Sequence, residues 1–187
     1  MRVITGTAKK RKLITPRGLA VRPTSDRVKE ALFNILGESV IAGRFLDLFA
    51  GAGTVGIEAL SRGAGAVVFV EKESNNIRII KRNLQITGLA GNAQCLGLPV
   101  DRAVTLLAAK QRSFDLIFMD PPYMQNLVSD TLSIITGNNL LLPGGTAVVE
   151  SSKNTLLPEN VADGLYMFRQ AVYGETLLTF YHNKKRD

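Results

Sequence analysis

The sequence has little cysteine and no long apolar run, and both shortages limit what the protein can be. Its 187 residues include one cysteine, Cys95, so neither an internal disulfide nor a cysteine-based metal cluster can form. No apolar stretch approaches the roughly 20 residues of a membrane-spanning helix. Charged residues also occupy the N-terminal positions where a secretory signal needs its apolar segment. We therefore expect a cytoplasmic protein with no membrane partner and no bound metal.

Charge is distributed unevenly along the chain. Residues 1–30 contain nine Lys and Arg against two Asp and Glu, a net charge of +7 that equals the charge of the whole chain. A neutral body with a basic arm is typical of a protein that binds a polyanion, although a solubilising tail is an alternative interpretation. We predict an N-terminal basic arm, residues 1–24, and one folded domain, residues 25–187, acting as a monomer.

The apolar pattern predicts an α/β protein. A helix should begin at Ser25 or Asp26 and end at Gly37. Beyond it, apolar strands alternate with amphipathic helices, which is typical of a parallel sheet covered by helices on both faces. We predict strands at 44–49, 66–71, 93–97, 114–119 and 146–151, with helices at 54–62, 74–87, 101–110 and 127–136.

The C-terminal part breaks this alternation. Residues 165–173 and 175–183 read as two strands of a hairpin with no helix between them, so the sheet should have seven strands and an antiparallel end. The one histidine, His182, falls in the last of these strands. Because it lies away from the two motifs described next, we predict a structural role for it.

The first motif is a glycine loop after the first strand of the sheet. Gly51, Gly53 and Gly56 form G-x-G-x-x-G between a strand and a helix, where the backbone can turn tightly and approach a ligand. Asp47 lies inside the preceding strand, where an unpaired carboxylate would be unfavourable. Glu71 ends the next strand, where an acid can accept hydrogen bonds from ribose hydroxyls. Such a loop can hold either a dinucleotide or S-adenosylmethionine. The negative charge of Asp47 would suit the sulfonium cation of S-adenosylmethionine.

The second motif, Asp120-Pro121-Pro122-Tyr123, ends the strand at 114–119. Two prolines make a stiff corner that presents the Asp120 carboxylate and the Pro121 carbonyl as hydrogen-bond acceptors. Tyr123 adds a flat face for stacking. Together these groups suit a planar base with an exocyclic amine, which the two acceptors would orient toward a methyl donor.

Both motifs resemble those of amino-group methyltransferases, and the chain is most similar to the RsmD family. The resemblance rests on "LITPRGLAVRPTSDRVKEALFNIL", "FLDLFAGAGTVGIEALSRGA", "FVEKE" and "MDPPY". It implies a Rossmann-like class I methyltransferase that uses S-adenosylmethionine to methylate the N2 amine of a guanine in small-subunit (16S) ribosomal RNA. The partner would be that RNA or the assembling subunit, and the target base would be unstacked.

The resemblance also assigns residues to each role. The cofactor would be held by Asp47, Phe49, Ala50, Gly51, Gly53 and Glu71, and the guanine by Asp120, Pro121, Pro122 and Tyr123. RNA phosphates would contact Arg22, Thr24 and Arg27. The charge of the N-terminal arm, independently of the resemblance, adds the basic run Lys9, Lys10, Arg11 and Lys12 as expected RNA contacts.

Four other functions share part of this pattern. A DNA adenine methyltransferase would use the same acceptors, but the chain has no obvious segment of the size needed to read a duplex. A protein glutamine methyltransferase typically has Asn in place of Asp120. A nicotinamide-dependent oxidoreductase would share the glycine loop but has no use for Asp-Pro-Pro-Tyr. A non-catalytic RNA-binding module would explain the basic arm and not the two motifs.

Overall fold

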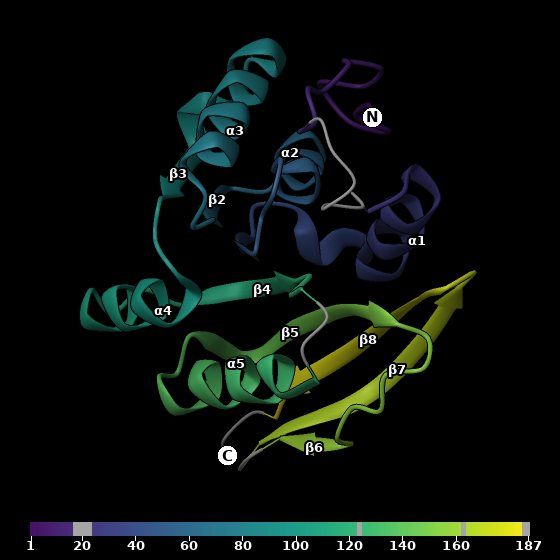
Figure 1. The fold of residues 1–187 in the computed structure, drawn as a ribbon, viewed down its shortest axis with the longest axis vertical. Helices are drawn as coiled ribbons and strands as arrows, with labels where there is room; N and C mark the ends of the chain where they lie inside the picture. Colours follow the sequence, from purple (N-terminus) through teal and green to yellow (C-terminus); the bar gives the residue numbers. More distant parts are fainter. Residues whose placement is uncertain (17–23, 123–124, 162–163, 185–187) are drawn as a thin grey trace.

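The computed structural model describes residues 1–16, 24–122, 125–161 and 164–184. Its strands are β1 (Arg44–Leu48), β2 (Ala66–Val70), β3 (Ala93–Leu96), β4 (Phe114–Met119), β5 (Leu141–Ser152), β6 (Asn160–Val161), β7 (Leu165–Tyr173) and β8 (Thr176–Asn183). They form one sheet in the order β3-β2-β1-β4-β5-β8-β7-β6 (Figure 1). The first five strands are parallel, and β8, β7 and β6 join in antiparallel fashion.

Helices cover both faces of this sheet. They are α1 (Asp26–Leu36), α2 (Thr54–Ser61), α3 (Ser74–Thr87), α4 (Val100–Ala109) and α5 (Gln125–Gly137), with short 3-10 turns η1 (Gly37–Val40) and η2 (Ala90–Asn92). The predicted fold class is confirmed, and so are the positions of the predicted helices and strands to within two residues, except for the start of β5. The sheet has one strand more than the predicted seven, because β6, at two residues, is too short to show an alternating pattern.

The ends of the helices follow local chemistry. The Ser25 side chain accepts a hydrogen bond from the Val28 N–H at 3.3 Å, which caps α1, and Gly37 ends that helix with a φ of 55°. Gly88 ends α3 in the left-handed helical conformation, with a φ of 74° and a ψ of 18°. β5 begins at Leu141, five residues before the predicted start, because a register shift against β4 accommodates the intervening Pro-Gly-Gly segment.

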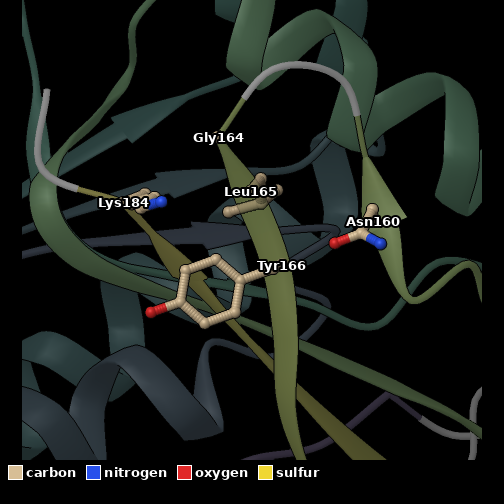
Figure 2. A pocket seen from close by; sticks show the side chains of 5 residues that line it. All are labelled: Asn160, Gly164, Leu165, Tyr166 and Lys184. Carbon is tan, nitrogen blue, oxygen red and sulfur yellow. The ribbon is translucent and has the colours of Figure 1, made fainter.

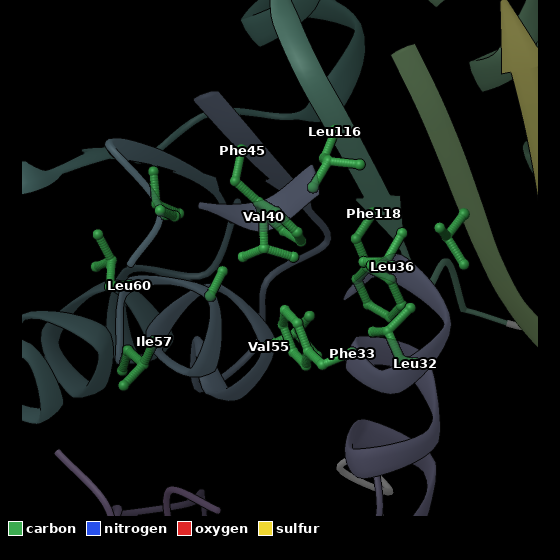
Figure 3. Packing of buried hydrophobic residues seen from close by; sticks show 14 of the residues in the cluster. Leu32, Phe33, Leu36, Val40, Phe45, Val55, Ile57, Leu60, Leu116 and Phe118 are labelled. Atoms are coloured by element: carbon green, nitrogen blue, oxygen red, sulfur yellow. The ribbon is translucent and has the colours of Figure 1, made fainter. Parts of the chain in front are cut away.

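Two apolar layers flank the sheet. On one face α1, α2 and α3 pack on β2, β1, β4, β5 and β8, with Phe33 of α1 stacked on Phe45 of β1 at 6.3 Å between ring centroids (Figure 3). On the other face α4 and α5 pack on the same strands around Leu132 and Ile135. Because side chains alternate along a strand, each core strand contributes to both layers, as expected for a parallel sheet buried on both faces.

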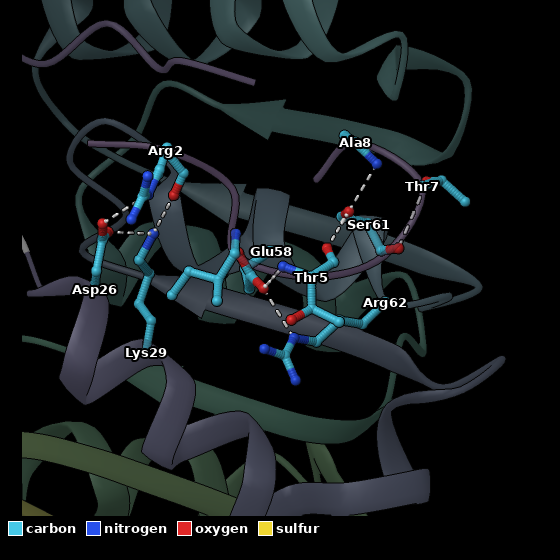
Figure 4. A network of polar contacts seen from close by, with 10 residues as sticks. Arg2, Thr5, Thr7, Ala8, Asp26, Lys29, Glu58, Ser61 and Arg62 are labelled. Carbon is cyan, nitrogen blue, oxygen red and sulfur yellow. Dashed lines mark hydrogen bonds and ion pairs between the residues drawn. The ribbon is translucent and has the colours of Figure 1, made fainter. Parts of the chain in front are cut away.

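Residues 1–16 pack against α2 on the same face as α1. Val3, Ala8 and Leu13 are buried, and Glu58 of α2 accepts hydrogen bonds from the backbone N–H groups of Ile4 and Thr5 at 2.8 and 3.0 Å (Figure 4). A buried carboxylate is stabilised by such donors. The first part of the predicted arm is therefore fixed to the domain through its backbone.

A buried lysine completes this polar network. Lys29 of α1 is fully buried, donates to the Arg2 carbonyl at 2.9 Å and lies 3.4 Å from the Asp26 carboxylate (Figure 4). Burial lowers the pKa of Lys29, while the charges of Glu58 and Asp26 oppose that shift.

Within the described part of the chain, no helix is both long and apolar enough to cross a membrane.

Candidate active site

The two sequence motifs leave the sheet side by side. β1 and β4 are parallel neighbours in which Leu48 is paired with Met119, and these are the last residues of the two strands. The glycine loop follows Leu48, and Asp120 follows Met119. Ligands bind beyond the carboxyl ends of the strands in open α/β sheets. The register therefore sets both motifs at the edge where such a ligand binds.

Four acids lie on one face of the sheet at this edge. Asp47 and Glu150 stand two residues from Phe45 and Val148 of the apolar layer under α1–α3, so their side chains face that layer. Glu71 and Asp120 directly follow β2 and β4; Glu71 bonds to the glycine loop, and the charges of Glu150 and Asp47 act on Asp120. Hydrogen bonds confirm the direction for three of them, as described below. Such a concentration of carboxylates favours a cationic ligand and disfavours a pyrophosphate.

The glycine loop is tight and closely packed. The Gly53 N–H donates to the Ala50 carbonyl at 2.7 Å, and Gly51 and Gly53 have φ values of 54° and 74°. Gly56 packs directly on β2, where an added Cβ would lie 2.3 Å from a ring carbon of Phe69. The first two glycines thus serve the tight turn, and the third serves the close helix–strand packing expected of this loop.

Glu71 closes the loop from the neighbouring strand. Its carboxylate accepts hydrogen bonds from the Gly51 N–H at 2.9 Å and from the Glu73 N–H at 2.8 Å. An ionised carboxylate has about four acceptor positions, so two remain for a ligand. The pairing brings together two of the predicted cofactor residues, Gly51 and Glu71, and leaves Glu71 able to bind ribose hydroxyls.

Asp47 supports the first turn of α2. Its carboxylate is almost completely buried and accepts a hydrogen bond from the Gly56 N–H at 2.9 Å, near the positive end of the helix dipole. Burial raises the pKa of Asp47 to about 7, although the Gly56 hydrogen bond opposes that shift, and the charge of Glu71 adds to it. A nearby cation would favour the ionised form.

Asp120 has a similar electrostatic environment. Burial raises its pKa well above its usual range, and the negative charges of Glu150 and Asp47 raise it further. Pro121 is buried and Pro122 is exposed, so the corner turns outward immediately after the acid. Tyr123, the fourth residue of the predicted guanine site, lies outside the described residues.

A hydrogen bond between Thr24 and Glu150 connects the segment before α1 to the edge of the sheet that carries the site. Glu150 of β5 stands beside Asp120, because Met119 and Val149 are paired in the sheet. The Thr24 hydroxyl donates to Glu150 at 2.8 Å, and both residues are buried. This bond attaches the start of α1 to the carboxyl end of β5. The Thr24 hydroxyl therefore bonds within the protein, and its predicted contact with RNA stays a prediction.

Part of the predicted RNA-binding set gathers around one hollow. Lys9, Lys10 and Arg27 line a cavity of about 320 Å³ between the N-terminal segment and α1, together with Arg2. Asp26 and Glu30 also line it, so the cations exceed the acids by two. Arg11 and Lys12 are exposed on the same segment, and Arg22 lies outside the described residues.

Sequence reasoning missed two features of the glycine loop. Phe49 has a φ of 58°, a left-handed conformation that is rare for a bulky residue and often marks a functional turn. Asn83 of α3 is fully buried and donates to the Ala52 carbonyl at 3.1 Å. Its position between Ile80 and Leu84 on the apolar face of the helix was the available signal, since a buried amide needs partners.

The structure also bears on metal binding. Among the residues that it describes, no group of three or more His, Cys, Asp or Glu side chains has the arrangement to hold a metal ion. His182 contacts the rings of Tyr166 and Phe168 at the other end of the sheet, with centroids 5.8 and 6.0 Å away.

A doubly wound sheet with a glycine loop after β1 and Asp-Pro-Pro after the adjacent β4 defines a Rossmann-like methyltransferase. The chain belongs to the RsmD family of these enzymes. A family model described as "Conserved hypothetical protein 95" matches residues 1–182. Ribosomal RNA small subunit methyltransferase D of Escherichia coli is 33% identical, over 98% of this chain and 90% of its own length. The Bacillus subtilis protein YlbH is 41% identical over the whole of both chains.

Solved structures agree with this assignment. The Escherichia coli protein yhhF superposes with a TM-score of 0.86 at 34% identity, covering 100% of this chain and 99% of its own. The 16S rRNA N2 G1207 methyltransferase RsmC of Thermus thermophilus, solved with AdoMet and guanosine, has a TM-score of 0.68 at 27% identity. That match covers 89% of this chain and 44% of RsmC.

Proposed function

We propose that this protein transfers a methyl group from S-adenosylmethionine to the exocyclic N2 amine of a guanine in 16S ribosomal RNA. The observation that carries the proposal is the register of β1 and β4. Because Leu48 and Met119 are paired, the glycine loop and Asp120 begin at adjacent positions on the same edge. A donor held by the loop and an amine held by Asp120 would therefore meet.

The acids at the edge support S-adenosylmethionine as the cofactor. Asp47, Glu71, Asp120 and Glu150 provide negative charge for a sulfonium, and the same charge would repel a dinucleotide's pyrophosphate. Glu71 retains two acceptor positions for the ribose hydroxyls. When bound, the cofactor supplies an electrophilic methyl group whose sulfur departs with the bonding electron pair as a neutral thioether.

The residues of the second motif would orient the amine. Asp120 and the Pro121 carbonyl accept the two N–H bonds of the guanine N2, so that its lone pair points at the methyl group. This arrangement lowers the barrier through positioning and electrostatics, without a covalent intermediate on the protein. A new N–C bond forms, and the nitrogen then loses one proton. Asp120, with its raised pKa, is suited to accept that proton.

Ribosomal RNA as the substrate is supported by the relatives and by charge. The RsmD proteins at 33% and 37% identity are named as small-subunit ribosomal RNA methyltransferases. RsmC of Thermus thermophilus, which modifies a guanine N2, was solved with guanosine. In this chain Lys9, Lys10 and Arg27 line a hollow with an excess of positive charge, which is suited to binding RNA phosphates. A loop nucleotide is the expected target, because its base can leave the stack.

The substrate class can be tested with a radiolabelled cofactor. Labelled methyl groups should enter unmodified small-subunit RNA, either free or bound by ribosomal proteins, and should enter neither duplex DNA nor protein. In parallel, S-adenosylhomocysteine should raise the melting temperature, whereas a nicotinamide dinucleotide should leave it unchanged. Transfer to DNA or stabilisation by the dinucleotide would contradict the proposal.

A further inference from the structure

An exposed aromatic surface lies on the antiparallel end of the sheet. Among described residues, β7 contributes Tyr166 and Phe168, which are 36% and 51% exposed. Phe168 approaches the rings of Phe180 and His182 on β8, at 6.1 and 6.0 Å between centroids, and Tyr166 approaches His182 at 5.8 Å. We call Tyr166, Phe168 and His182 the ring cluster. Exposing two large rings to water is unfavourable unless a partner covers them.

A β-bulge sets a cation beside these rings. The register of β7 and β8 shifts between Met167 and Arg169, so Phe168 and Arg169 both stand opposite Phe180. In a regular strand these two neighbours would point to opposite faces. Directly paired residues share a face, so the bulge directs Arg169 to the face that carries the ring cluster. Arg169 is exposed there.

A hollow at one end of the ring cluster adds a second cation. It has a volume of about 420 Å³ and is lined by Asn160, Gly164, Leu165, Tyr166 and Lys184 (Figure 2). Tyr166 therefore belongs both to the hollow and to the ring cluster. Lys184 follows His182 by two residues, and none of the five lining residues is acidic. The surface thus combines planar rings with positive charge and a side-chain amide.

The ring cluster faces the same side of the sheet as the active-site acids. Phe180, which contacts Phe168, belongs to the apolar layer under α1–α3, and Asp47 and Glu150 face that layer as well. His182 is paired with Thr146, four residues before Glu150 along β5, and β7 lies two strands beyond β5 in the sheet. At about 3.3 Å per residue and about 4.8 Å per strand, the ring cluster lies roughly 15–20 Å from the site edge on the same face, a distance that a short single strand of RNA can cover.

We propose that the ring cluster, with Arg169 and Lys184, binds a single-stranded stretch of the RNA substrate flanking the target nucleotide. Bases stack on Phe168 and Tyr166, and phosphates contact the two cations, as on other sheets whose exposed aromatic residues stack RNA bases. RNA is favoured over a protein partner because a polyanion complements both cations, and none of the residues that line the hollow is acidic. This inference rests on the proposed function, because it assumes an RNA substrate.

The test compares RNA binding by variants of one strand. Tyr166→Ala/Phe168→Ala should weaken binding to unmodified small-subunit RNA transcribed in vitro by about tenfold or more, because each base–aromatic stack contributes strongly. Val172→Ala is the matched control, since Val172 is 60% exposed on β7 and paired with Leu177, on the opposite face. It should change binding less than about twofold. Arg169→Ala should reduce the slope of log K against log salt by about 0.7.

A second variant separates stacking from general loss of structure. Phe168→Leu keeps an apolar side chain against Phe180 but removes the flat ring, so it should weaken RNA binding while the melting temperature with S-adenosylhomocysteine stays unchanged. Equal RNA affinity in the double variant and in Val172→Ala would overturn the inference. So would a defect seen only with protein-bound RNA, which would assign the surface to a ribosomal protein.

The two proposals fail in different ways. If the wild-type protein methylates no ribosomal RNA in any form, the proposed function is wrong, whatever the variants bind. If the wild type methylates the RNA, and the double variant binds and methylates it as well as Val172→Ala does, only the role of the ring cluster is wrong.

Discussion

Asn83 of α3 binds the backbone of Ile14 through both halves of its side-chain amide. Its carbonyl oxygen accepts from the Ile14 N–H at 2.8 Å, and its amino group donates to the Ile14 carbonyl at 2.9 Å. The same amino group donates to the Ala52 carbonyl in the glycine loop. One buried side chain thus connects the basic N-terminal segment to the predicted cofactor site.

Replacing this amide should weaken both regions at once. Asn83→Ala removes the side-chain partner of three backbone groups, of which the Ala52 carbonyl is buried, and this should lower the free energy of unfolding by about 2–3 kcal/mol and weaken S-adenosylhomocysteine binding. Denaturant unfolding and calorimetry measure the two effects. Gln85→Ala, at an exposed position of the same helix, is the control and should change stability by less than about 0.5 kcal/mol. Equal results for the two variants would contradict this role of Asn83.

The third glycine of the loop should tolerate no side chain. In Gly56→Ala the new methyl group would meet the Phe69 ring at 2.3 Å, so either α2 or the ring must move. Overpacking of this kind typically lowers stability by about 1–3 kcal/mol. Gly91→Ala is the control, because an added Cβ there meets no atom within 4 Å. Melting temperatures of the two variants, each with and without S-adenosylhomocysteine, provide the measurement. A Gly56→Ala protein as stable as the Gly91→Ala protein would contradict the packing argument.

The sequence predicted the parts of the fold that depend on local patterns. The apolar strands, the helix caps and the helix ends at Gly37 and Gly88 are each determined by neighbouring residues, so the order of helices and strands could be predicted from the sequence. The contacts of residues 1–16 could not, because they depend on Glu58, Lys29 and Asn83, whose partners are distant in the chain. Charge alone therefore indicated a basic arm, whereas the structure shows that its backbone is fixed to α2 and α3.

For the site as well, the sequence predicted the local motifs but not the contacts between residues that are distant in the chain. The two motifs were visible because each follows a strand, and parallel strands end at the same edge. The bond between Thr24 and Glu150 was not visible, because it joins residues 126 positions apart. The bulge at Phe168 and Arg169 also left no sequence signal, since neither glycine nor proline marks it.

Cofactor binding should depend on pH through the buried acids. Burial raises the pKa of Asp47 to about 7, so in the ligand-free protein this group gains a proton as the pH falls below that value. The usual pKa of an aspartate is about 4, so between about pH 4 and pH 7 the folded, ligand-free protein keeps a proton on Asp47 that the unfolded chain has lost. The stability of the ligand-free protein therefore falls as the pH rises through this range. A bound sulfonium favours the ionised acid, so binding releases protons and becomes tighter at higher pH.

S-adenosylhomocysteine, which lacks the sulfonium, provides the comparison. The affinity for S-adenosylmethionine relative to that for S-adenosylhomocysteine should rise roughly five- to tenfold between about pH 5.5 and 7.5. Asp47→Asn should flatten this dependence. Calorimetry at several pH values measures both ratios, and a ratio independent of pH in the wild type would show that these acids do not face the sulfonium.

The basic segment should contribute to RNA affinity mainly through counterion release. Replacing Lys9, Lys10, Arg11 and Lys12 by Ala should weaken RNA binding and lower the slope of log K against log salt, by about 0.7 for each single-strand phosphate that the segment no longer neutralises. Lys81→Ala/Lys110→Ala, at two exposed positions elsewhere, is the control. If the four-residue variant keeps the wild-type slope, the segment is a solubilising surface and does not bind RNA.

The most direct test of the proposed function is nucleoside analysis of unmodified small-subunit ribosomal RNA after incubation with the protein and labelled S-adenosylmethionine. The label should appear in N2-methylguanosine, and Asp120→Ala should reduce transfer at least about a hundredfold while S-adenosylhomocysteine binding changes little. Asp120→Asn keeps one acceptor oxygen and should retain more activity than the alanine variant. Label in N6-methyladenosine, or full turnover by Asp120→Ala, would contradict the function and the site proposed for this protein.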